Sequence, residues 1–268
     1  MRTKIYLFSL ICLFFAACDH IDENDRLIYV EPETVKRCVL LEDFTGQKCV
    51  NCPRGTEVIE QMQEAYGEGI IAVGIHSSPL GFKGNATNIG LATDLGDEYY
   101  NHWQLEYQPV GLINRHGAIN YTDWMTKVRE EMTKTSTIDI SLEASLNGNQ
   151  ITINAKETSL GGTYNGKLQI WILEDSITAT QTRHDPIDND NVTINDKNYI
   201  HNHVLRDAVN GHWGEDLSLD ANEPKKQTYS YEIPINGKWN PSHLSIVAFV
   251  YNDNGVEQAI KAKVINNE

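Results

Sequence analysis

Two cysteines separated by two residues, Cys49 and Cys52, are the side chains in this sequence best suited to chemistry. They stand between an apolar stretch, residues 39–41, and a stretch with helical periodicity. At the start of a helix the backbone amides and the positive end of the helix dipole stabilise a thiolate, and Lys48 adds a nearby positive charge. Pro53 fits the first helical turn, where a missing amide hydrogen costs nothing. The pattern predicts thiol-disulfide exchange, with Cys49 as the nucleophile and Cys52 as the resolving thiol.

The elements that must position this pair alternate between strand and helix patterns. The sequence predicts strands at residues 37–43, 70–75 and 110–113, a short partner strand near Ile119, and helices at residues 58–66, 91–103 and from a cap at Thr122 onward. The order β-α-β-α-β-β-α is that of an α/β thioredoxin-like domain. We therefore predict such a domain at residues 36–135.

Three residues outside the dithiol acquire candidate roles in a domain of this kind. Thioredoxin-like folds place a cis proline just before the third strand, packed against the dithiol, and Pro109 stands at that position. The backbone of Gln108 is then expected to pair with an incoming peptide, and Lys48 is a second candidate for substrate binding. The alternative for Pro109 is an ordinary trans proline that opens a strand.

A carboxylate completes the predicted catalytic group. Asp43 lies six residues before Cys49 and is a candidate to accept a proton from Cys52 as that thiol attacks a mixed disulfide. Glu42 competes for this role, because strand alternation allows one of the two to point inward. A solvated, acidic strand end is the alternative for both residues.

From residue 137 the apolar pattern changes to period two. Strands are expected at residues 138–146, 151–155, 167–173, 229–235, 244–251 and 258–264, several of them beside Asn-Gly turn pairs. This pattern predicts an all-β, immunoglobulin-like antiparallel sandwich at residues 136–268. A long polar insertion near residues 181–226 interrupts it, with one short apolar helical stretch around residues 204–209.

The same insertion concentrates residues that bind metals elsewhere, namely His201, His203, His212, Asp185, Asp188 and Asp190. The sequence has no second cysteine pair for a four-cysteine zinc site, and residues 188–191 lack the glycine and the terminal glutamate of an EF-hand loop. We therefore predict no metal and no cofactor, and we expect His201 and His203 to hydrogen-bond between the two domains.

The amino terminus has the features of an export signal. Arg2 and Lys4 precede an apolar run, and small residues lead directly into Cys18. This arrangement predicts a lipoprotein signal peptide at residues 1–17, an acylated Cys18 and a flexible acidic tether at residues 18–35. Cleavage by an ordinary signal peptidase, or an uncleaved anchor, is the alternative. In each case the protein is exported. With a lipid on Cys18, we expect it to associate with the outer membrane of the cell envelope, on the periplasmic or the exposed side.

The net charge and the number of cysteines narrow the range of possible functions. The net charge is −15, and removal of residues 1–17, which carry two basic and no acidic residues, makes it −17. Such an acidic chain with no basic patch excludes nucleic-acid binding. After Cys12 leaves with the signal and Cys18 is acylated, Cys38 has no partner besides the dithiol pair. We interpret Cys38 as a buried, inert thiol, with a third redox partner as the alternative.

Four segments carry a resemblance to a known family. The sequences DFTGQKCVNCP (43–53), PVGLINR (109–115), YIHNHVLR (199–206) and LSIVAFVY (244–251) are similar to those of the outer-membrane-protein-28-related lipoproteins of anaerobic Gram-negative bacteria. The resemblance implies an outer-membrane lipoprotein with a thioredoxin-like domain followed by a β-sandwich and, for some relatives, a role as a surface adhesin or receptor. Lys48 departs from the family pattern, in which an aromatic residue is usual, and so does Val110, where threonine is common.

Two functions follow from these observations. The first is thiol-disulfide exchange by the Cys49–Cys52 pair with a protein thiol or disulfide as substrate, which leaves open whether the protein is an enzyme. The second is a binding or adhesin-type lipoprotein for an extracellular protein or glycan, in which the same two cysteines form only a structural disulfide.

Overall fold

The structure, a computed structural model, describes residues 31–187, 189–235 and 237–266. The predicted signal peptide, Cys18 and most of the tether lie outside the described residues. None of the helices between residues 31 and 266 combines the length and the apolar character that a bilayer crossing requires.

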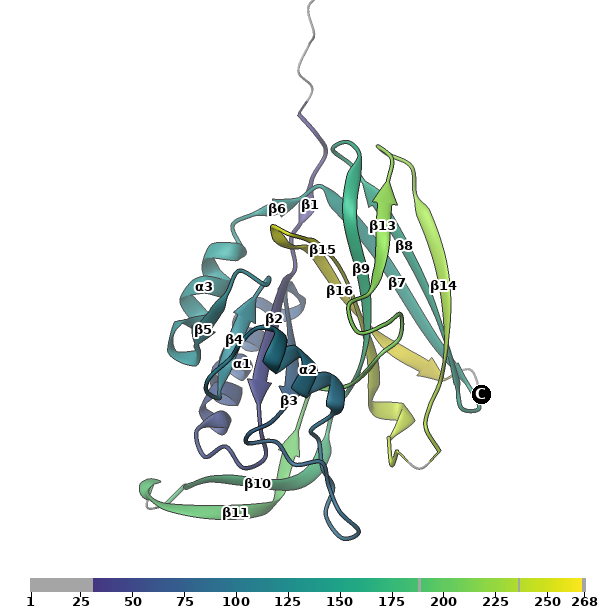
Figure 1. The fold of residues 1–268 in the computed structure, drawn as a ribbon. Coiled ribbons are helices and arrows are strands. Elements are labelled where there is room, and N and C mark those ends of the chain that lie inside the picture. The colour runs from purple at the N-terminus through teal and green to yellow at the C-terminus, as the bar shows by residue number, and fades with distance from the viewer. Residues whose placement is uncertain (1–30, 188, 236, 267–268) are drawn as a thin grey trace, which may run out of the picture. The chain divides into compact units, whose positions relative to one another are not determined.

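The described residues form three α-helices and many strands (Figure 1). The helices are α1 (Cys52–Tyr66), α2 (Asp94–His102) and α3 (Trp124–Glu131), with 3₁₀ turns at Gly67–Gly69, Tyr121–Asp123 and Pro241–His243. The strands are β1 (Val35–Lys36), β2 (Val39–Thr45), β3 (Ile70–His76), β4 (Val110–Ile113), β5 (Ala118–Asn120), β6 (Thr135–Ser136), β7 (Ile138–Asn147), β8 (Gln150–Ser159), β9 (Tyr164–Glu174), β10 (Ile177–Asp185), β11 (Asn189–His201), β12 (Val204–Ala208), β13 (Glu215–Leu219), β14 (Lys225–Glu232), β15 (Leu244–Asn252) and β16 (Gly255–Asn266).

One large mixed sheet dominates the structure. Twelve strands of the described residues belong to it, in the order β14-β8-β7-β16-β15-β9-β12-β3-β2-β4-β5, with β13 also paired to β9. The prediction of a thioredoxin-like α/β domain followed by an immunoglobulin-like sandwich is therefore wrong. The described chain is mostly β, and its amino-terminal and carboxy-terminal strands share one sheet.

Strand β12 explains why the two halves do not separate. It pairs antiparallel with β9 from Val204 to Ala208 and parallel with β3 through Val204 and Gly74. This segment is a strand and not the predicted short helix. A register shift between Leu205 and Asp207 breaks the alternation of buried positions along it. The spacing of the apolar residues in this segment therefore resembles that of a helix. Pairing with two distant strands, β9 and β3, makes the segment a strand.

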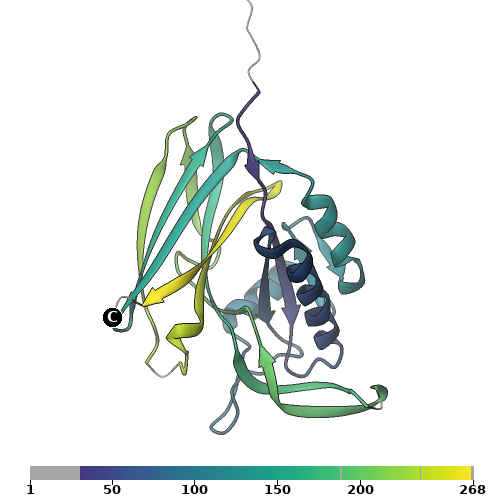
Figure 2. The ribbon, with the colours of Figure 1, turned by 180° about the vertical axis from the view of Figure 1, so that it is seen from behind.

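Strand β2 lies between β3 and β4 and is buried along its whole length. Leu40 and Phe44 pack on one face against α2 and the aromatic side chains of β9 and β15, whereas Val39 and Leu41 pack on the other against α1 and α3. Figures 1 and 2 show α2 on one side of β2 and β3, with α1 and α3 on the other. Any polar side chain on β2 must therefore find its partner inside the protein.

Trp124 fixes α3 on this sheet. Its side chain is fully buried, and a Cβ added at Gly111 of β4 would lie 2.5 Å from the Trp124 Nε1. Glycine at position 111 thus makes room for the indole ring.

The helix begins at Trp124, after a 3₁₀ turn in which the Asn120 side chain accepts a hydrogen bond from the Thr122 amide at 3.1 Å. Asn120, not the predicted Thr122, caps this region.

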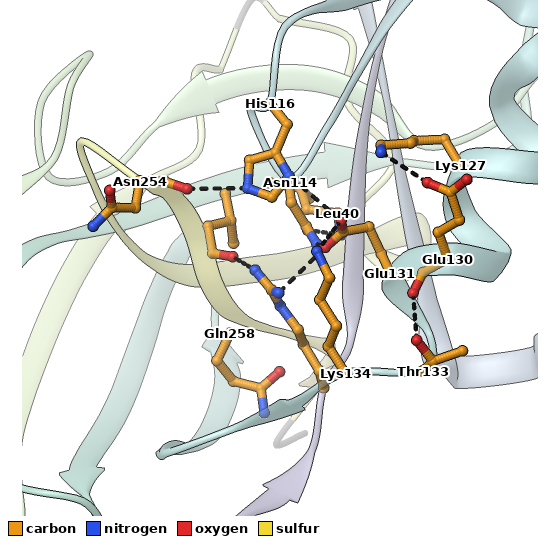
Figure 3. A network of polar contacts seen from close by, with 12 residues as sticks. Leu40, Asn114, His116, Lys127, Glu130, Glu131, Thr133, Lys134, Asn254 and Gln258 are labelled. Carbon is orange, nitrogen blue, oxygen red and sulfur yellow. Dashed lines mark hydrogen bonds and ion pairs between the residues drawn. The ribbon is translucent and has the colours of Figure 1, made fainter.

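A buried carboxylate links α3 to the strands on both sides (Figure 3). Glu131 is fully buried and accepts hydrogen bonds from the Lys134 Nζ at 2.6 Å and the Asn114 Nδ2 at 3.1 Å, and Arg37 lies 3.2 Å away. Burial acts to raise the pKa of Glu131, but these hydrogen bonds and the Arg37 charge hold it below its usual range. Arg37 also donates to the Val256 carbonyl and so ties β16 to the same network.

Candidate functional site

The predicted dithiol is a closed disulfide in the structure. Cys49 and Cys52 are joined with a Cα–Cα distance of 5.4 Å. Helix α1 begins at Cys52, with Pro53 in its first turn, so Cys49 lies in the turn that precedes the helix. The two side chains are 1 % and 2 % exposed. The disulfide is therefore shielded from large reaction partners.

The β10–β11 hairpin covers the disulfide from one side. Gln181 of β10 is buried, and its Nε2 donates to the carbonyls of Cys49 at 2.8 Å and Gly46 at 3.2 Å. The Thr182 amide donates to the Gln47 carbonyl at 2.8 Å. In the other direction, the Gln47 Nε2 donates a hydrogen bond to the Thr180 carbonyl at 3.0 Å. In Figure 1 the hairpin crosses beyond the carboxyl ends of β2 and β3.

The segment that follows β3 covers the turn from another side. The Lys48 amide donates to the Leu80 carbonyl at 2.9 Å, and a Cβ added at Gly46 would lie 2.5 Å from the Leu80 backbone. The Lys48 side chain is exposed, with its ammonium group 5.6 Å from the centre of the Phe82 ring. Lys48 therefore lies at the surface beside the buried pair.

The Gln108–Pro109 peptide bond is cis, as predicted from the sequence. Pro109 is buried near α1, where a Cβ added at Gly55 would lie 3.4 Å from the Pro109 Cβ. Gln108 is also buried, and its Nε2 donates to the Thr45 carbonyl at 2.9 Å and to Ser77 at 3.0–3.1 Å. The side chain of Gln108 thus holds the ends of β2 and β3 together.

Both candidate carboxylates are buried, which excludes the alternative of a solvated strand end. Glu42 faces the carboxy-terminal strands and accepts hydrogen bonds from the Arg115 Nε at 3.2–3.3 Å and Nη2 at 3.1 Å. Asp43 faces the opposite side, where α1 and the disulfide lie. Strand alternation does separate the two side chains. Because β2 is covered on both faces, however, each of them points into the protein.

A small polar cavity brings Asp43 next to Cys52. It has a volume of about 20 Å³ and is lined by Asp43, Cys52, Gln181 and three histidines, His76, His201 and His203, among others. The volume is enough for one water molecule. Asp43 is 2 % exposed and its Oδ1 has no hydrogen-bond partner among the described residues. Burial raises the pKa of Asp43 to about 8.

The three histidines of this cavity are held in the neutral form. The rings of His76 and His201 lie 5.2 Å apart, centre to centre, and burial lowers the pKa of His203 to about 4. Burial lowers the pKa of His201 to about 4, and burial together with the neighbouring His201 lowers the pKa of His76. Of the predicted site residues, the structure therefore brings Cys52 and Asp43 into one cavity with these histidines. Lys48 lies outside that cavity.

Sequence reasoning missed His76 and the two glutamines that hold the hairpin. A signal for Gln181 exists, because Ile177, Ala179 and Gln181 occupy alternate positions of β10 and all three are buried. A polar side chain at a core-facing position of a strand must have buried partners. Gln47 has no comparable signal, since it lies in an irregular turn.

The remaining candidate ligands of the insertion have other contacts. Among residues 31–187, 189–235 and 237–266, no group of three or more His, Cys, Asp or Glu side chains is arranged to hold a metal ion. The His212 Nδ1 lies 2.6 Å from Glu98, and the His203 carbonyl accepts a hydrogen bond from the Gly74 amide at 2.8 Å. Asp188 lies outside the described residues, and so does the side chain of Asp190.

Cys38 is half-buried and forms no disulfide in the structure. Its Sγ donates to the Glu68 carbonyl at 3.1 Å, and burial raises the pKa of the thiol to about 12. A thiol that stays protonated at neutral pH is a poor nucleophile, in agreement with the interpretation of Cys38 as inert.

Comparison with known proteins gives a family and a fold. The family model described as outer membrane protein Omp28 matches residues 96–268. HBP35 of Porphyromonas gingivalis has a similar structure, with a TM-score of 0.63 and 15 % identity over 85 % of this chain and 76 % of that one. A domain of the outer membrane lipoprotein Omp28 from Porphyromonas gingivalis is 27 % identical over 50 % of this chain and 92 % of that one, with a TM-score of 0.34. No curated protein sequence matches the chain.

The fold and the site define a mostly β protein of one large mixed sheet with a shielded disulfide beside a buried carboxyl group. The chain belongs to the Omp28 family of outer membrane proteins. Membership confirms the localisation at the outer membrane predicted from the sequence. The likeness to HBP35 concerns the fold alone.

Proposed function

We propose that this protein is a lipid-anchored binding protein of the outer membrane, in which the Cys49–Cys52 disulfide stabilises the fold. The burial of both cysteines, 1 % and 2 % exposed, carries this proposal. Thiol-disulfide exchange requires a thiolate to reach one of the sulfur atoms, and the β10–β11 hairpin lies over them. The partner is an extracellular protein or glycan.

Thiol-disulfide exchange remains a second candidate because of Asp43. A carboxyl group with a pKa of about 8 beside Cys52 is suited to accept and return a proton near neutral pH. Exchange would require the hairpin to open first. The two candidates therefore differ in how fast the native protein reacts with a reductant.

Gln181→Ala should accelerate reduction of the disulfide roughly tenfold to thirtyfold. The substitution removes two hydrogen bonds to the carbonyls of Gly46 and Cys49, each worth about 1 kcal/mol, and so favours opening of the hairpin. The measurement is the rate at which excess dithiothreitol reduces the native protein at pH 7.5, followed by alkylation and mass spectrometry.

Gln227→Ala is the matched control, because Gln227 lies on β14 and bonds to Tyr229. Its rate should equal that of the unmodified protein. If the unmodified protein is reduced within seconds and Gln181→Ala changes nothing, the disulfide is freely accessible. Exchange is then the better function, and Cys52→Ala should trap partners as mixed disulfides.

The double variant Cys49→Ser/Cys52→Ser should keep the fold and lose about 2 kcal/mol of unfolding free energy. This is the loop-entropy effect expected for a disulfide that closes so short a loop. Urea unfolding measures it, with Cys38→Ser as the variant that breaks no disulfide. Equal stability of the double variant and the unmodified protein would contradict a stabilising role.

A further inference from the structure

A second hollow, far along the chain from the dithiol, has the features of a ligand site. It has a volume of about 540 Å³, within the range of small-molecule sites, roughly 300–1,000 Å³. Aromatic side chains from separate elements meet there: Trp103 follows α2, Trp213 precedes β13 and Tyr251 belongs to β15. All three are partly exposed.

Internal hydrogen bonds hold these rings in place. The Trp213 Nε1 donates to the Glu98 Oε1 at 2.7 Å, and the Tyr251 hydroxyl donates to the Trp213 carbonyl at 2.6 Å. The Trp213 ring also packs against Tyr99 at 4.9 Å and His102 at 4.2 Å, centre to centre. A rigid, partly exposed indole offers a flat apolar surface at little entropic cost on binding.

Two buried N–H donors at this hollow have no hydrogen-bond partner in the part of the chain that the structure describes. Arg115 lines it and is 8 % exposed, and its Nη1 makes no hydrogen bond among the described residues. The Trp103 Nε1 is likewise buried and unpaired among them. An unpaired buried donor is costly, because it has lost its water without gaining another acceptor. A ligand that brings oxygen acceptors would satisfy both donors.

Charge selects the kind of ligand. Arg115 is paired with Glu42, which leaves it little attraction for an anion. Its guanidinium already lies 4.3 to 5.9 Å from the ring centres of Tyr251, Trp213 and Trp103, the rings that would otherwise attract a cation. On the rim, Lys167 pairs with Asp216 at 2.9 Å, and Asp253 adds a further negative charge. That negative charge, with a net charge of −15 for the whole chain, disfavours an anion. A neutral ligand is the remaining match.

We propose that this hollow binds a neutral saccharide. This proposal rests on the binding function proposed above and names the class of its ligand. The C–H face of a pyranose ring packs on Trp213, since the face of an indole ring is its electron-rich side. Sugar oxygens accept from Arg115 and Trp103, and hydroxyl groups bond to rim amides such as Asn165 and Asn252.

The test is isothermal titration calorimetry on the full-length lipoprotein in a detergent without a sugar head group. The probes are maltotriose, cellotriose, chitotriose and mannotriose, up to millimolar concentration. At least one should bind, and Trp213→Ala should weaken it by on the order of tenfold or more. Asn165→Ala, at an exposed rim position that does not support the fold, should weaken it roughly fivefold.

Trp239→Ala is the matched control, because Trp239 stacks on Tyr231 and Arg206 away from the hollow. It should bind as the unmodified protein does. Absence of binding by all four probes, or binding that Trp213→Ala and Asn165→Ala both leave unchanged, would overturn the proposal. Binding of short peptides instead, lost in Trp213→Ala, would also overturn it and assign the hollow to a protein partner. Reduction kinetics on the same preparation test the proposed role of the disulfide independently.

Discussion

Glu42→Gln should lower the free energy of unfolding by about 3 to 5 kcal/mol, the cost of breaking a fully buried ion pair. The side chains of Glu42 and Arg115 are 0 % and 3 % exposed, and the guanidinium contacts both carboxylate oxygens. Glutamine keeps the shape but removes the charge, so Arg115 is left cationic inside the protein. Aromatic rings around it, the nearest being Tyr251 at 4.3 Å, compensate only in part. Urea unfolding at pH 7 measures the loss.

Two further variants make this result specific. Glu143→Gln is the same change at an exposed position of β7 and should alter stability by less than about 0.5 kcal/mol. Replacing Glu42 and Arg115 together by methionine should recover most of the loss, because no unpaired charge stays buried. A Glu42→Gln protein as stable as Glu143→Gln would mean that water reaches the ion pair.

Local periodicity predicted most elements of the fold but not how they combine. The apolar runs at Ile70–His76 and Leu244–Asn252 are continuous and became the buried strands β3 and β15. Val204–Ala208 carried no such signal, since its burial pattern is interrupted by a register shift. Pairing of that segment with β9 and β3 depends on residues far away in the sequence. One strand without a local pattern thus joins strands from both halves of the chain into a single sheet.

The same limit applies to the site. Cys49, Cys52 and the cis peptide before Pro109 could be predicted, because each follows from a short motif. The burial of Glu42 could not, since it depends on Arg115 and on strands that come much later in the chain. Nor could the cover over the disulfide, in which Gln181 reaches carbonyls 132 and 135 residues before it. The alternation of Ile177, Ala179 and Gln181 marks Gln181 as facing the core, but it does not show which carbonyls that side chain reaches.

Asp43 gives the second large prediction, a pH-dependent effect on stability. Its pKa in the folded protein is about 8, against an ordinary value of 3.8, because burial disfavours the carboxylate. Between about pH 4 and pH 8 the unfolded chain loses this proton while the folded protein keeps it. The folded state therefore binds more protons, and the free energy of unfolding falls as the pH rises through this range. Above about pH 8 the Asp43 carboxyl group is ionised in both states, and its contribution to the free energy of unfolding no longer changes with pH.

Asp43→Asn removes this titration. The stability of the variant relative to the unmodified protein should therefore increase steadily from pH 4 to pH 8, by about 1.4 kcal/mol for each unit of the pKa difference. Urea unfolding at pH 4.5, 5.5, 6.5 and 7.5 measures it.

Both proteins also lose stability in acid. Below the ordinary pKa of histidine, His76, His201 and His203 gain protons in the unfolded chain before they do so in the folded protein. This loss is common to both proteins and cancels in the difference. Asp220→Asn, at an exposed position, should give a difference that does not vary with pH. A flat profile for Asp43→Asn as well would mean that Asp43 is ionised in the folded protein. The carboxyl group beside Cys52 would then have no proton to give at neutral pH, and the observation that favours exchange chemistry would be lost.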